Sequence, residues 1–71
     1  MDEYKIILAF DEEAQKWFAQ NDEIPILLED RSLDSLITRV KLAVPEMLII
    51  NNLPHVGVHL LFIMETMAVT A

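Results

Sequence analysis

Residues 32–50 read SLDSLITRVKLAVPEMLII, and this stretch decides the fold because it holds the clearest helical pattern in the chain. Apolar residues recur in it at spacings of three and four, which gathers them into one stripe of an α-helix. The stripe consists of Leu33, Leu36, Ile37, Val40, Val44, Met47 and Leu48. Ser32 is the expected N-cap, and Asp34 puts a negative charge in the first turn, where the helix dipole favours one.

Pro45 complicates the end of this helix, because proline inside a helix removes one hydrogen bond and clashes with the preceding turn. Either the helix kinks at Pro45, or it stops near Ala43 and a second turn starts with the proline. The apolar stripe continues in phase across Pro45, so we expect a kinked, continuous helix to about Ile50. Asn51 and Asn52 follow, and asparagine tolerates the left-handed conformation that ends many helices.

Three stretches before the helix alternate or carry strand-forming residues, as expected of β-strands: Tyr4–Phe10, Lys16–Gln20 and Ile26–Glu29. Polar residues at 11–15 and 21–23 separate them and suit turns. After the helix, residues 56–64 are apolar on both faces, which indicates a final strand that is central or lies at a subunit interface. The expected order is β-β-β-α-β, an α+β fold with one helix packed on an antiparallel sheet.

The chain has 71 residues, 54% of them hydrophobic, and no cysteine. This length predicts a single domain over residues 1–71, too small to bury all of its apolar surface. The excess apolar surface therefore suggests self-association, and we expect a homodimer. The absence of cysteine excludes disulfides and thiolate metal sites, and it fits a reducing compartment.

Twelve acidic residues against five basic ones give a net charge of −7. Such a surface repels phosphates, so we expect no direct binding to nucleic acid, and it would steer the protein toward a basic protein partner. Net charge can also serve solubility alone. The acidic start Met1-Asp2-Glu3 does not resemble a secretory signal, and no apolar run approaches the length that spans a bilayer. We therefore expect a cytoplasmic protein without a membrane association.

No common catalytic pattern is present, and we expect no enzyme activity, no cofactor and no metal. Gly57 is the only glycine, so a glycine-rich phosphate loop is excluded. His55 and His59 are four residues apart, a metal-binding spacing on a helix. In a strand the same spacing separates two side chains by about 13 Å, which is too far for one metal ion.

Partner binding is the chemistry that the remaining candidates suggest. Carboxylates gather in the two expected turns, and an exposed aromatic side chain between them could anchor a partner. Trp17 and Phe18 must face opposite ways on a strand, so at least one of them belongs to the core. The candidate partner-binding residues are Asp11, Glu12, Glu13, Trp17, Asp22 and Glu23.

The N-terminal half resembles the HicB-type antitoxins of bacteria. The resemblance is carried by residues 4–7 (YKII), 11–14 (DEEA), 16–19 (KWFA) and 21–25 (NDEIP), and by the helix start at 30–36 (DRSLDSL). Residues 44–48 (VPEML) and Asn51 resemble more closely a short stand-alone bacterial branch of unknown function. The family has a glycine after the turn proline; here Ile26 follows Pro25, and isoleucine does not easily adopt positive φ.

The resemblance implies a partial RNase H-like sheet that masks a small basic RNase toxin. The DNA-binding domain of such antitoxins has no counterpart after this domain, so we expect only the binding half of the role. A structural reading stays open beside this one, in which the protein is a homo-oligomeric accessory domain whose apolar final strand pairs across a two-fold axis.

Overall fold

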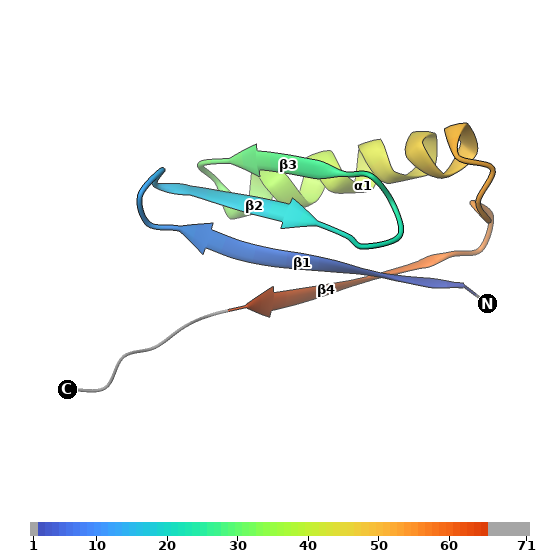
Figure 1. The fold of residues 1–71 in the computed structure, drawn as a ribbon, viewed down its shortest axis with the longest axis horizontal. Coiled ribbons are helices and arrows are strands. Elements are labelled where there is room, and N and C mark those ends of the chain that lie inside the picture. Colours follow the sequence, from blue (N-terminus) through green and yellow to red (C-terminus); the bar gives the residue numbers. More distant parts are fainter. Residues whose placement is uncertain (1, 66–71) are drawn as a thin grey trace.

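The computed structural model describes residues 2–65, so the single-domain prediction for residues 1–71 extends beyond the described range. The elements are β1 (Glu3–Asp11), β2 (Lys16–Gln20), β3 (Leu27–Asp30), α1 (Leu33–Ile50) and β4 (His59–Glu65). The strands form one sheet in the order β3-β2-β1-β4, and α1 packs on one of its faces (Figure 1). This arrangement confirms the α+β class and the β-β-β-α-β order.

The sheet is mixed, which corrects the expectation of a purely antiparallel one. β2 pairs antiparallel with both β1 and β3, but β4 pairs parallel with β1. The reason lies in the connection through α1, which carries the chain back to the end of the sheet where β1 and β3 begin. A strand that follows such a crossover runs parallel to the strand before it.

The core lies between α1 and one face of the sheet. Leu36, Val40, Val44 and Leu48 are fully buried and form the central part of the predicted apolar stripe. They pack with sheet residues that alternate along β1 and β2, namely Tyr4, Ile6, Leu8 and Ala19, and with Ile24 and Ile26. The alternation predicted for the first strand therefore sets which of its side chains meet the helix.

The helix runs without interruption from Leu33 to Ile50 with Pro45 inside it, as the phase of the stripe predicts. Ser32 is the N-cap, and its Oγ accepts a hydrogen bond from the Ser35 amide at 3.2 Å. Asn52 follows the helix with φ +54°, the left-handed conformation expected there. The length and composition of α1 do not make it a candidate for crossing a membrane, and it is the only helix in residues 2–65.

Only β2 has the predicted bounds: β1 extends one residue further at each end, and β3 and β4 both start later and end one residue later than predicted. β3 starts at Leu27 instead of Ile26, because the Ile26 amide donates to the Ile24 carbonyl at 2.7 Å and so belongs to the preceding turn. β4 starts at His59 instead of Val56, because the chain bends around Gly57, whose φ is +69°.

β4 is an edge strand, so the central position considered for the final strand is wrong. Ile26 does not need the positive φ of the family's glycine, since positive φ outside glycine occurs only at Gln15 and Asn52 among the described residues. Its side chain is buried in the core instead.

Candidate partner-binding surface

The first acidic cluster forms the β1–β2 hairpin turn. One carboxylate oxygen organises the turn: the Asp11 Oδ1 atom accepts hydrogen bonds from the amides of Glu13 (3.0 Å) and Ala14 (3.3 Å). Asp11 is therefore engaged in shaping the turn, in the manner of an Asx-turn. Glu12 and Glu13 remain exposed, and their carboxylates are available to a partner.

The second acidic cluster lies in the β2–β3 turn and is organised by Asn21. The Asn21 Oδ1 atom accepts from the amides of Glu23 (2.7 Å) and Ile24 (2.6 Å), and its Nδ2 atom donates to the Lys5 carbonyl (2.6 Å). These bonds tie the turn to β1 and hold Asp22 and Glu23 in solvent. Sequence reasoning listed the carboxylates but missed Asn21, which positions them.

The structure does not bring the two acidic clusters together. One turn precedes β2 and the other follows it, so they lie at opposite ends of the sheet (Figure 1). The five residues of β2 separate them by about 17 Å, since a strand advances by about 3.4 Å per residue. A partner that meets both clusters must therefore span the sheet.

Trp17 lies on the helix-covered face, where it is half-buried. Its ring packs edge-to-face on Phe10, with ring centroids 5.3 Å apart and an interplanar angle of 62°. It also borders the buried core. Phe18 points to the opposite face, so Phe18 is the better placed of the two aromatic residues for contact with a partner.

The opposite face of the sheet carries no helix in the described part of the chain, and its centre is apolar. Strand alternation and register place the same-face side chains in rows across the sheet. One row joins Leu27, Gln20, Ile7 and Ile63, and the next joins Glu29, Phe18, Ala9 and Glu65. We call this surface the open face; its apolar members are Ile7, Ala9, Phe18, Leu27, Leu61 and Ile63.

Carboxylates border the open face, and Lys5 and Lys16 lie on the same side of the sheet. Glu29 and Glu65 flank the Phe18–Ala9 pair on the two outer strands. Asp22 and Glu23 line a hollow together with side chains at the start of β1, among them Lys5 and Ile7. The sequence predicts part of this surface, because a strand with Trp17 toward the core must turn Phe18 to the other face. The places of Glu29 and Glu65 depend on the pairing register, which only the structure shows.

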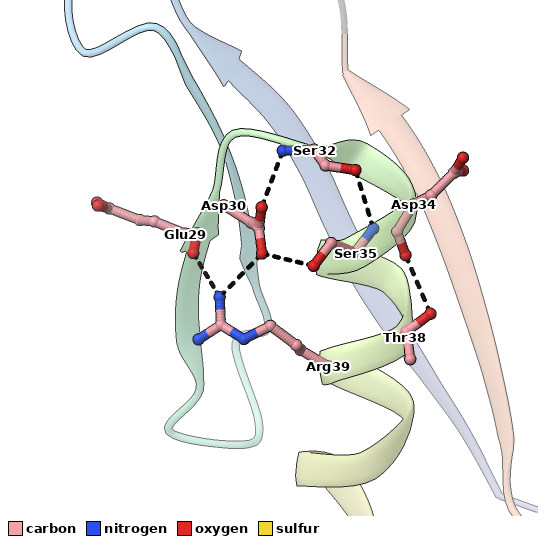
Figure 2. Close-up of polar contacts among 7 residues, drawn as sticks. All are labelled: Glu29, Asp30, Ser32, Asp34, Ser35, Thr38 and Arg39. Atoms are coloured by element: carbon pink, nitrogen blue, oxygen red, sulfur yellow. Dashed lines mark hydrogen bonds and ion pairs between the residues drawn. The ribbon is translucent and has the colours of Figure 1, made fainter.

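A second polar cluster, around Asp30, fastens the start of α1 to β3 (Figure 2). The Asp30 carboxylate accepts from the Ser32 amide (2.8 Å), the Ser35 hydroxyl (2.8 Å) and the Arg39 guanidinium (3.3 Å). The Ser32 amide bond, followed by that of the Ser35 hydroxyl and the bond and charge of Arg39, lowers the pKa of Asp30. Arg39 also donates to the Glu29 carbonyl at 2.7 Å.

The Asp30 cluster has a structural role, since its hydrogen bonds join the end of β3 to the start of α1. Ser32, Ser35 and Arg39 hold the carboxylate from three directions. His55 and His59 are both exposed, one in the loop before β4 and the other on its first residue. Within residues 2–65, no three histidine or carboxylate side chains converge as a metal would require.

Comparison with known proteins places this chain in a family. Residues 3–71 match a domain of unknown function, DUF1902. The chain belongs to the DUF1902 family. None of the curated proteins matches it. The DUF1902 chain is similar to the crystal structure of a hypothetical protein from the extremely thermophilic bacterium Thermus thermophilus, with 27% identity and a TM-score of 0.83. The match covers 96% of this chain and 99% of the other, so the whole DUF1902 fold is shared between them.

Proposed function

We propose that this DUF1902 protein is a non-enzymatic binding protein that masks a small basic protein with its open face, in the manner of an antitoxin. The observation that carries the proposal is the open face itself, an apolar sheet surface bordered by Glu29, Glu65 and the acidic turns. Apolar contact at the centre would supply affinity, and carboxylates at the rim would select and steer a cationic partner.

The net charge of −7 supports a basic partner, because opposite charge raises the rate of encounter. The resemblance of residues 4–25 to HicB-type antitoxins supports the class of that partner, a small basic RNase toxin. Coverage of such a toxin by carboxylates would compete with the RNA phosphates that its basic surface otherwise binds.

The two acidic turns fit this role in spite of their separation. Asp22 and Glu23 border one end of the open face, while Glu12 and Glu13 lie beyond its other end. A partner that covers the apolar rows would therefore meet carboxylates at both ends. This geometry predicts that charge changes at either end weaken the complex, and that added salt weakens it as well.

The proposal predicts that a neighbouring gene encodes a small basic protein, and the test uses that protein. Expressed alone it should arrest translation, and co-expression of this chain should restore growth. The double variant Glu29→Lys/Glu65→Lys reverses the charge on both sides of Phe18 and should raise the Kd at least tenfold, about 1.4 kcal/mol. Isothermal titration calorimetry and rescue of growth measure the two effects.

Glu46→Lys is the matched control, because Glu46 is exposed on α1, away from the open face. It changes the net charge in the same direction, by half as much as the double variant, and should leave affinity within about twofold. Equal loss in both variants would show that net charge, and not the open face, governs binding. A neighbour that neither binds nor arrests translation would overturn the proposal.

A further inference from the structure

β4 is the most apolar strand of the sheet and the least protected. Its five inner residues, 60–64, are all apolar, yet it lies at the edge, with Leu61 43% and Met64 50% exposed. Within the described chain, the Cα atoms of α1 come within 8 Å of those in β2 and β3 but not of those in β4. In Figure 1, β4 accordingly lies on the side of β1 that is remote from α1.

The opposite edge of the sheet is protected in the ways that natural edge strands use. β3 has only four residues, follows Pro25 closely and ends in Glu29 and Asp30. β4 has seven residues and contains neither lysine nor proline. Such an exposed apolar edge invites pairing with another strand.

The backbone of β4 offers a defined set of groups for that pairing. The His59 amide donates to the Asp2 carbonyl at 2.8 Å, so the backbone groups of His59 point toward β1. Because these directions alternate along a strand, the N–H and C=O groups of Leu60, Phe62 and Met64 point away from β1. These are the groups that a further strand would bond.

We propose that β4 pairs antiparallel with β4 of a second copy, around a two-fold axis through Phe62. In that register each outward-pointing residue meets another: Phe62 lies opposite Phe62, and Leu60 lies opposite Met64. Leu61 lies opposite Ile63 on the open face, in a closer, non-hydrogen-bonded pair. This register uses the full strand, because Phe62 is its middle residue.

The sequence of β4 is complementary to itself about Phe62, and this points to a second copy as the occupant of the edge. All inner pairs are apolar, and the ends place the imidazole of His59 opposite the carboxylate of Glu65. His59 also neighbours Glu3 in its own chain, so the end of the strand is acidic around each imidazole. Opposite-charge and apolar cross-strand pairs stabilise a sheet.

The dimer would form one continuous sheet. Its two-fold axis would run normal to that sheet, so the open faces of both copies would lie on the same side. Ile7, Leu61 and Ile63 of each copy would then form one apolar band across the junction. This inference uses the edge of β4 and does not rest on the proposed binding of a basic protein.

Cysteine cross-linking tests the register directly, because the natural chain contains no cysteine. Leu61→Cys protein carrying a tag is mixed with untagged Ile63→Cys protein and oxidised. Cα atoms of a non-hydrogen-bonded pair are about 4.5 Å apart, within the range that a disulfide spans. We expect the mixed 61–63 dimer in at least fivefold excess over either like pair.

Leu27→Cys is the matched control, since Leu27 is 65% exposed on the same face but lies on the opposite edge strand. It should form no more dimer than random collision gives. Preferential cross-linking through Leu27, or equal amounts of 61–61 and 61–63 products, would overturn the register.

Met64→Pro tests the edge hydrogen bonds without a cross-link. The Met64 N–H points away from β1, so proline there removes no bond inside the protomer but blocks the pairing. The dimer dissociation constant, measured by sedimentation equilibrium, should rise at least tenfold while far-ultraviolet circular dichroism stays native. A natural chain that is monomeric up to millimolar concentration would overturn the proposal, as would a folded Met64→Pro variant that dimerises as well as the natural chain. If Met64→Pro does not fold, the cross-linking result decides.

Discussion

Single side chains in this protein owe their roles to the face of the strand or helix that they occupy. Trp17 and Phe18 are neighbours in sequence, but one packs on the helix side and the other lies on the open face. Leu36 and Leu42 are likewise residues of one helix, yet Leu36 is fully buried while Leu42 is 71% exposed. Chemically similar residues should therefore differ sharply in their effect on stability.

Leu36→Ala should lower the free energy of unfolding by about 2–5 kcal/mol, because it leaves a cavity against the sheet. Leu42→Ala makes the same chemical change in the same helix and should have an effect of about 0.5 kcal/mol or less. Urea denaturation followed by tryptophan fluorescence measures both. Equal destabilisation by the two variants would contradict the orientation of α1.

Tyr4 gives a spectroscopic test of burial, since it is the only tyrosine in the chain. Its side chain is 3% exposed, and its hydroxyl donates to the Pro54 carbonyl at 3.4 Å. Burial, followed by the nearby charges of Asp2 and Glu23, raises the pKa of Tyr4 above its ordinary value of 10.0. The native state thus favours the neutral phenol.

Absorbance at 295 nm should therefore show a titration midpoint for Tyr4 above that of the unfolded chain in urea. Because the pKa of Tyr4 is higher in the folded state, its stabilising contribution is present below pH 10 and is lost as the pH rises through the folded-state value. A midpoint equal to that of the unfolded chain would mean that the phenol is accessible to water.

At the scale of elements, the join between β3 and α1 depends on charge. Asp30, on the last residue of β3, bonds Ser32 and Ser35 at the start of the helix and Arg39 one turn further on. Arg39 closes the cluster from the helix side by also bonding the Glu29 carbonyl (Figure 2). The ionised carboxylate is the acceptor that these donors share.

The stability of the protein should therefore depend on pH in the acid range through Asp30. Its pKa is lowered on folding, chiefly by the Ser32 amide, so the stabilising contribution is present above the ordinary aspartate value of 3.8 and is lost as the pH falls through the folded-state pKa. Asp30→Asn should reduce this dependence in thermal melts between about pH 5 and pH 2. Asp34→Asn is the control, because Asp34 is exposed in the first turn of α1 and does not bond the Asp30 carboxylate. This variant should keep most of the dependence of stability on pH.

At the scale of the whole molecule, local patterns predicted each element but not the way in which the elements assemble. The spacing of Leu36, Val40 and Val44 was enough to place the helix, and the Ser32 cap fixed its start. The order of strands depends on long-range pairing that no local window contains. Two-sided apolarity in β4 therefore left open a central position and a position at a subunit interface.

The candidate binding surface was predictable only in part, for the same reason. The acidic turns at Asp11–Glu13 and Asp22–Glu23 follow from local turn chemistry. The open face exists because α1 covers one side of the sheet only, and Glu29 and Glu65 join it through the register of β3 and β4. Register is set by tertiary packing, and a shift of one residue would exchange the two faces.

The pairing of β1 with β4 has a consequence for how the chain is made. Residues 3–9 of β1 each pair with a β4 residue 56 positions later, as Glu3 pairs with His59. During synthesis on the ribosome the hairpin and the helix can form early, but β1 keeps one open edge until its last partner has emerged. Vectorial synthesis thus leaves this edge of β1 unpaired until β4 has emerged from the ribosome.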